Sequence, residues 1–62
     1  MYTIAFAKVW DHSTFVYQNK PYRKVGNSHS VDMTTGKDVI LALQDKVTPI
    51  PEYLINKQFN LR

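Results

Sequence analysis

The stretch FVYQNKPYRKV, residues 15–25, decides how this chain is expected to fold. Aromatic and β-branched residues, which favour strands, lie on both sides of Gln18-Asn19. A two-residue turn at that point pairs Phe15 with Tyr22 and gives Asn19 a positive φ, which asparagine tolerates better than most residues. The stretch is therefore predicted to be a β-hairpin.

The same register sorts the hairpin side chains onto two faces, because successive residues of a strand point to opposite sides. One face is predicted to carry Phe15, Tyr17, Tyr22 and Lys24, and the other to carry Val16, Arg23 and Val25. Pro21 has no amide hydrogen to give to a neighbouring strand. We therefore expect the hairpin to lie at an edge of the sheet.

The segments on either side of the hairpin carry further strand and turn signals. Residues 2–10 have apolar or small side chains on both faces of an alternating pattern, which predicts a strand that is central or packed on both sides. Residues 11–13 are of turn-forming types. Residues 29–33 are predicted to form a short strand with Val31 and Met33 on one face.

Two later segments allow more than one interpretation. Gly36 supplies the positive φ of a tight turn before residues 38–43, the most apolar run of the chain. Two β-branched residues in that run favour a strand over a helix spanning residues 37–46. Residues 51–59 are either a short helix that begins at Pro51 or part of an extended tail.

Together these elements predict a mainly β fold. We expect a five-stranded antiparallel meander or a small SH3-like barrel, with a short C-terminal helix or an extended tail. Residues 1–62 make a single small domain, in which 1–47 form the meander and 48–62 the helix or tail. The expected core consists of Ile4, Phe6, Phe15, Tyr22, Val31, Met33, Val39, Leu41 and Leu43, closed by Val47, Leu54 or Phe59.

Length and composition limit what such a domain contains. A chain of 62 residues buries only about 60% of the surface that its unfolded form exposes, so its core is thin. It has no cysteine, which rules out a disulfide or thiolate metal site and fits a reducing compartment. The N-terminal residues are not typical of a signal peptide, and no apolar run approaches the roughly 20 residues of a membrane span. We expect a complete cytoplasmic protein with no membrane association.

The sequence offers little catalytic chemistry. Asp11, His12 and Ser13 are the residue types of a hydrolase triad, but neighbours in an extended chain point to alternating sides, which favours a simple turn. His12 and His29 are the only histidines, and no third metal ligand is expected near both. We therefore expect no cofactor, no metal site and no enzymatic activity.

A binding role is better supported than a catalytic one. The net charge of +3 favours an acidic partner surface or a polyanion. Aromatic side chains of the hairpin are of the kind that stack on bases or dock into a partner, and its basic side chains attract phosphates or acidic groups. The predicted partner-binding residues are Trp10, Tyr17, Lys20, Tyr22, Arg23 and Lys24.

Several of these residues also have a purely structural interpretation. Phe15 and Tyr22 are equally suited to the core, in which case the neighbouring lysines only protect an exposed edge from pairing with other chains. Trp10 is either a lid on the core beside the first turn or an exposed anchor, since tryptophan is enriched at binding hot spots. Both interpretations stay open on the sequence alone.

Residues 14–50 resemble a pattern found in short, uncharacterised β-rich accessory proteins of tailed bacteriophages. The resemblance is carried by FVYQNKPYRKV, then VDMTTGKDV, then DKVTPI. These correspond to an aromatic hairpin, a strand with a Thr-Gly turn, and a Val-x-Pro ending. The chain departs from the pattern at Asn19, where such hairpins usually have glycine. The resemblance implies a phage-encoded factor for host interaction or anti-defence, without catalytic residues.

Three functional hypotheses follow. The first is a non-enzymatic accessory protein that binds and inhibits or modulates a host protein in the host cytoplasm. The second is a small barrel that binds single-stranded DNA or RNA through the basic and aromatic hairpin. The third is a self-associating module whose thin core is completed by a second copy as a homodimer.

Overall fold

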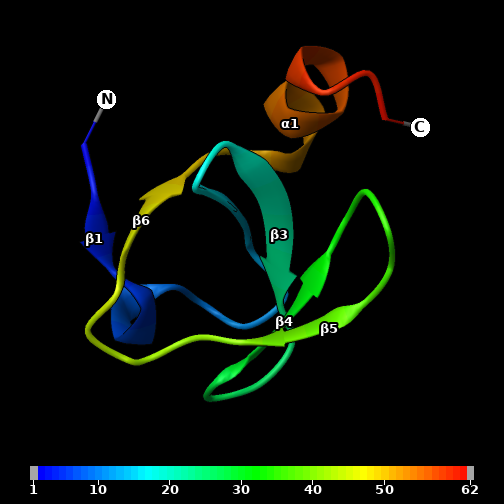
Figure 1. Cartoon of the computed structure of the whole chain (residues 1–62). Helices are drawn as coiled ribbons and strands as arrows, with labels where there is room; N and C mark the ends of the chain where they lie inside the picture. Colours follow the sequence, from blue (N-terminus) through cyan, green and yellow to red (C-terminus); the bar gives the residue numbers. More distant parts are fainter. Residues whose placement is uncertain (1, 62) are drawn as a thin grey trace.

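Over residues 2–61, which the computed structural model describes, the chain forms six strands and a short C-terminal helix (Figure 1). The strands are β1 (Ile4–Ala5), β2 (Thr14–Tyr17), β3 (Lys20–Lys24), β4 (His29–Asp32), β5 (Asp38–Ile40) and β6 (Lys46–Pro49). A 3-10 turn, η1 (Phe6–Lys8), follows β1, and the helix α1 spans Glu52–Gln58. The mainly β class with a C-terminal helix is confirmed, with one strand more than expected.

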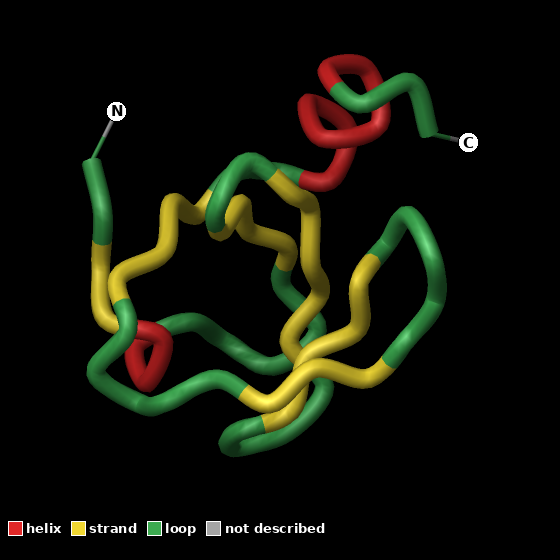
Figure 2. Tube along the Cα trace, in the orientation of Figure 1, coloured by secondary structure: helices red, strands yellow, loops and turns green. Residues whose placement is uncertain are grey.

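All six described strands belong to one antiparallel sheet with the order β1-β6-β2-β3-β4-β5. Strands β2 to β5 form a meander, and the chain then crosses back so that β6 pairs with β2. Figure 2 shows the strands curling around a common centre. Strands β1 and β5 are the two edges, so the sheet is open and not a closed barrel.

The hairpin β2–β3 has the predicted register. Phe15 pairs with Tyr22, and the connecting residues Gln18 and Asn19 have φ values of 51° and 64°. Two consecutive positive φ values are those of a type I′ turn, whose twist matches that of the flanking strands. The local prediction is therefore confirmed in both pairing and turn.

The predicted position of the hairpin at a sheet edge is wrong, because β2 and β3 are the two central strands. The pairing of β3 with β4 begins at Tyr22 and Asp32, one residue after Pro21. Beyond that pair, the Pro21 carbonyl still accepts a hydrogen bond from the Met33 amide at 3.0 Å. Proline is tolerated here because its missing donor falls where the ladder between the two strands ends.

The prediction of one long strand over residues 2–10 is also wrong. Strand β1 has only two residues and lies at an edge, and η1 then turns the chain. The amide of Phe6 donates to the Asp45 carbonyl at 2.7 Å, which ties the turn to the segment before β6. The turn brings both Phe6 and Val9 into the core, a spacing of three residues that a strand does not allow.

Residues 38–43 form a strand only over β5, and the alternative helix over residues 37–46 is absent. The Leu41 amide donates to the Ser28 carbonyl, after which the chain leaves the sheet. The Asp45 carboxylate accepts a hydrogen bond from the Ala42 amide and closes a turn that leads into β6. Strand β6 spans the predicted boundary between meander and tail.

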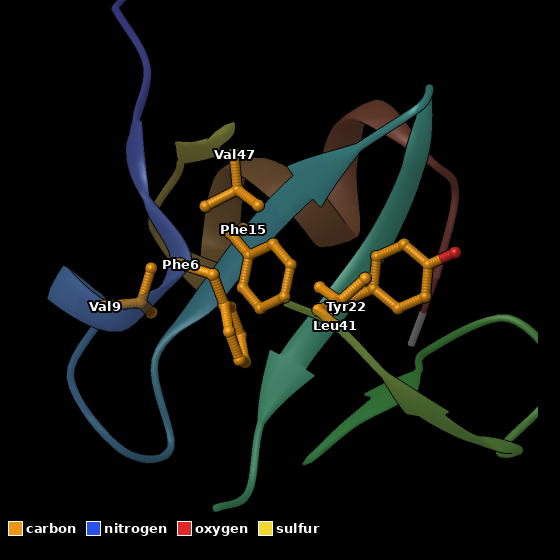
Figure 3. Packing of buried hydrophobic residues seen from close by; sticks show 6 residues of the cluster. All are labelled: Phe6, Val9, Phe15, Tyr22, Leu41 and Val47. Carbon is orange, nitrogen blue, oxygen red and sulfur yellow. The ribbon is translucent and has the colours of Figure 1, made fainter. Parts of the chain in front are cut away.

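The core is built around three aromatic rings (Figure 3). Phe6 meets Phe15 edge to face at 5.5 Å between ring centroids, and Phe15 stacks on Tyr22 at 5.7 Å. The cluster of buried apolar residues consists of Phe6, Val9, Phe15, Tyr22, Leu41 and Val47, with Ile4, Tyr17 and Val39 packed against it. Five of the expected core residues are thus buried, while Val9 was not expected there.

Other expected core residues lie elsewhere. The pairing of Tyr22 with Asp32 turns Asp32 and Ser30 toward the core face of β4, so Val31 and Met33 are only half-buried. Leu43 is exposed in the loop before β6. The prediction that β4 directs its apolar side chains inward is therefore wrong, because the register with β3 selects the opposite face.

Helix α1 packs against β2 on the side of the hairpin away from the aromatic cluster (Figure 3). The Pro51 carbonyl accepts hydrogen bonds from the Leu54 and Ile55 amides and starts the helix. Ile55 is fully buried, whereas Leu54 is 40% exposed and Phe59 half-buried. A single isoleucine therefore anchors a helix that is too short to be stable alone.

We predict that Ile55→Ala lowers the free energy of unfolding by about 2–5 kcal/mol, because it removes the buried anchor of α1. The matched control is Leu54→Ala, which deletes the same number of atoms from a more exposed position and should cost far less. Urea denaturation followed by circular dichroism measures both values. Equal losses in the two variants would contradict the docking role of Ile55.

The turn of the β2–β3 hairpin, Gln18-Asn19, supports a second prediction. Gln18→Asn should raise the free energy of unfolding by up to about 1 kcal/mol, since asparagine tolerates the left-handed region better than glutamine. The reverse exchange at the other turn position, Asn19→Gln, should lower it. Urea denaturation again provides the comparison, and a loss of stability in Gln18→Asn would be inconsistent with the positive φ at that residue.

Candidate interaction surface

The six predicted partner-binding residues do not form one patch. Two are buried, one is committed to an ion pair, and the remaining three lie at two separate ends of the hairpin. Trp10 precedes β2, while Tyr17 and Lys20 flank the turn at its far end. A surface that combines all six residues is therefore excluded by the fold.

Lys24 is the clearest departure from expectation, because its side chain is only 5% exposed. Its Nζ donates hydrogen bonds to the carbonyl oxygens of Phe6 at 3.2 Å and Val9 at 2.8 Å. The ammonium also lies 4.7 Å from the centre of the Phe6 ring, within the range of a cation–π contact. The assignment of Lys24 as a contact residue is therefore wrong, and its role is internal.

Tyr22 is also part of the core, with 7% of its surface exposed. Burial is the main cause that raises the pKa of its hydroxyl above 10.0, and the negative charge of Asp32 and the nearby Tyr17 raise it further. Tyr22 faces Asp32 across the β3–β4 pair. The structural interpretation of this ring is the correct one.

Arg23 lies on the outer face of the hairpin, where its side chain contacts the loop before β2 and the first residue of α1. One guanidinium nitrogen donates to the His12 carbonyl at 2.8 Å, and the other pairs with the Glu52 carboxylate at 2.5 Å. Both side chains of the ion pair are partly exposed, so its contribution to stability is small. Its main consequence is that the charge of Arg23 is already compensated at the start of α1.

At the turn of the hairpin, Lys20 is exposed and Tyr17 is half-buried. The Tyr17 ring lies 6.4 Å from the Tyr22 ring and extends the aromatic cluster toward the surface. Lys20 is thus the single basic side chain of the hairpin strands, residues 14–17 and 20–24, that is both exposed and without a salt bridge.

Trp10 is 82% exposed, the highest value among the large apolar side chains of residues 2–61. It follows Val9, which is buried, and begins a turn closed by the hydrogen bond from the Ser13 amide to the Trp10 carbonyl at 3.1 Å. Within this turn His12 has a φ of 69°. The interpretation of Trp10 as a core lid is therefore wrong.

The same turn borders an open cleft of about 450 Å³ that the sequence did not indicate. The cleft is lined by Tyr2, His12, Ser13, Thr14, Pro49, Ile50, Pro51 and Glu52. Two of these lining residues are joined by the hydrogen bond that the Thr14 hydroxyl donates to the Ile50 carbonyl. Only the pairing of β6 with β1 and β2 brings these distant segments together. No local signal in the sequence could have revealed this.

One pair of side chains has the residue types of a catalytic dyad. Ser30 lies directly opposite Lys24 in the β3–β4 pair, and serine with lysine is a known nucleophile–base combination. However, Ser30 is fully buried, and its hydroxyl has no hydrogen-bond partner. The Lys24 Nζ donates its hydrogen bonds to two carbonyls and none to the Ser30 hydroxyl. The pair therefore offers no accessible nucleophile.

Among residues 2–61 no three potential ligand side chains come close enough to hold a metal ion. Neither helical segment in that range has the length and apolar character needed to cross a membrane. The chain matches no family model, no curated protein and no solved structure.

The raised pKa of Tyr22 predicts how stability changes at high pH. Because the neutral hydroxyl is favoured in the folded state, its contribution to stability is complete below pH 10 and is lost as the pH rises through the folded-state pKa. Above pH 10, Tyr22→Phe should therefore lose stability less steeply than the wild type. Thermal unfolding between pH 8 and 11.5 tests this.

Tyr53→Phe is the matched control, since it removes a hydroxyl from an exposed position on α1. The wild type and both variants contain the same lysines, so the titration of the lysines affects the stability of each protein equally and does not change the comparison. The same slope in the wild type and in Tyr22→Phe would contradict the assigned cause.

Proposed function

We propose that this protein is a non-enzymatic accessory protein that binds a host protein and blocks its surface, with Trp10 as the central contact. The observation that supports this proposal most directly is the 82% exposure of Trp10 on a hydrogen-bonded turn. The resemblance of residues 14–50 to phage accessory proteins makes a bacterial protein the expected partner and the host cytoplasm the expected location.

The exposure of Trp10 favours binding because burying this ring would add substantially to a thin core. The adjacent Val9 is buried, yet the Trp10 ring next to it in the sequence is exposed. Tryptophan is also among the residues most enriched at binding hot spots. An exposed indole on a hydrogen-bonded turn loses little conformational entropy when a partner covers it.

The charges of the surface point to an acidic partner protein. Five lysines are exposed in the described part of the chain: Lys8, Lys20, Lys37, Lys46 and Lys57. The exposed acids in the same part are Asp11, Asp38 and Glu52, and the last of these is paired with Arg23. The free surface charge is thus positive, and it would attract a protein with an acidic rim around an apolar pocket.

The alternative of single-stranded DNA or RNA binding loses support from the hairpin. Of its three basic side chains, Lys24 is buried and Arg23 is paired, which leaves Lys20 to contact phosphate. Tyr22 is buried as well and offers no ring for a base to stack on. A groove that tracks a nucleic-acid backbone requires several free cations together with exposed rings.

A direct test uses the tagged protein to capture partners from a bacterial lysate after nuclease treatment, with a wash at high salt. The captured protein is then purified and titrated against three forms of the chain: wild type, Trp10→Ala and Tyr53→Ala. We expect Trp10→Ala to weaken binding about 30-fold or more, as a hot-spot residue does. Tyr53→Ala removes another exposed aromatic ring, 71% accessible on α1 against 82% for Trp10, and should bind like the wild type.

Two outcomes would contradict the proposal. Recovery of nucleic acid alone, released by salt, would favour the nucleic-acid hypothesis, because phosphate contacts weaken steeply as salt rises. A mass that doubles with concentration in the wild type but not in Trp10→Ala would mean that the indole binds a second copy. Either result would replace the host-protein interpretation.

A further inference from the structure

We propose that Lys24 is the positioning residue for Trp10: its buried ammonium holds the segment Phe6–Ser13 on the sheet and so fixes where the indole is presented. This inference rests on the proposed role of Trp10 and extends it to a buried residue. Lys24 lies at the end of β3 and is separated from Trp10 by 14 positions in the sequence.

The side chain of Lys24 holds the first half of the segment. Its Nζ accepts no hydrogen bond and donates to the carbonyls of Phe6 and Val9, the residue that begins η1 and the residue that follows it. Hydrogen bonds from a charged ammonium to carbonyl oxygens are stronger than those between neutral groups. The Phe6 ring below the ammonium supplies a third favourable contact.

The backbone of Lys24 is hydrogen-bonded to the second half of the segment Phe6–Ser13. Its amide donates to the Ser13 carbonyl at 2.9 Å, and its carbonyl accepts from the His12 amide at 2.7 Å. One residue therefore contacts both sides of the exposed pair Trp10-Asp11. The indole therefore lies on a short loop, and both ends of that loop are hydrogen-bonded to Lys24.

The positive charge is what lysine adds at this site. Methionine has a similar length and would fill the same space without a desolvation cost, and replacing buried charges by apolar groups often leaves stability unchanged. Among residues 2–61 no carboxylate pairs with this ammonium, so its partners are the two carbonyls and the ring. Loss of the charge should thus affect the attachment of the segment more than the packing of the core.

The test compares Lys24→Met with Lys20→Met, which removes an exposed lysine at the far end of the hairpin. In Lys24→Met, hydrogen exchange of the Val9 and Ser13 amides should accelerate at least tenfold, while the Met33 amide, bonded to Pro21 in the sheet, should change little. Lys20→Met should leave all three rates unchanged. A uniform acceleration, or none, would overturn the inference.

Binding to the purified partner provides the second readout. We expect Lys24→Met to weaken binding at least tenfold, and Lys24→Met combined with Trp10→Ala to bind no worse than Trp10→Ala alone. This coupling is what a residue acting through Trp10 produces, and a purely structural defect would instead add to the loss. Additive losses would therefore overturn the positioning role.

A measurement on the wild-type protein keeps the inference testable if Lys24→Met fails to fold. A buried ammonium bonded to two carbonyls exchanges its hydrogens slowly with water, so its ¹⁵N–¹H signal should persist at neutral pH, with contacts to the Phe6 ring. Absence of that signal would overturn the inference.

The two proposals fail in different ways. Unchanged binding by Trp10→Ala would overturn the proposed function, whatever the exchange rates of Lys24→Met. Normal binding by Lys24→Met, together with a strong loss in Trp10→Ala, would overturn only the positioning role.

Discussion

The stacked contact between Phe15 and Tyr22 across the β2–β3 hairpin is the interaction on which the rest of the structure depends. Every other strand of the described sheet lies on one side or the other of this pair, since β6 adds to β2 and β4 adds to β3. Phe6 completes the cluster from outside the hairpin. With so few residues, one aromatic pair provides both the centre of the core and the centre of the sheet.

The inner face of this sheet is unusually polar for so small a core. Lys24, Ser30 and Asp32 all point inward and are buried, and two of them use the main chain as their partner. Lys24 bonds the carbonyls around η1, while Asp32 accepts from the Thr34 amide at the following turn. Buried polar side chains in this protein therefore help to anchor irregular segments to the sheet, in addition to the apolar contacts of Phe6 and Val9.

This division of roles links the core to the proposed binding surface. The apolar cluster holds the strands together, and the buried polar groups determine how the connecting segments leave them. Trp10 lies on one such segment, at the end of the hairpin opposite to the turn. His12 and Ser13 of the same segment line the open cleft, whose other side is formed by residues 49–52 at the start of α1. A small domain can in this way present a defined contact without a large core.

The sequence by itself determined the local features of this protein: the β2–β3 register, the Gln18-Asn19 turn and the positive φ at Gly36, while it left the helix after Pro51 open against an extended tail. These depend on neighbouring residues, whose preferences act at short range. Tertiary structure alone decided which face of β4 is buried, because the inner face of a strand depends on which strands pair with it and in which register. The tertiary structure also decided that Lys24 is internal and that Trp10 is exposed, and it formed the cleft, which could not be foreseen.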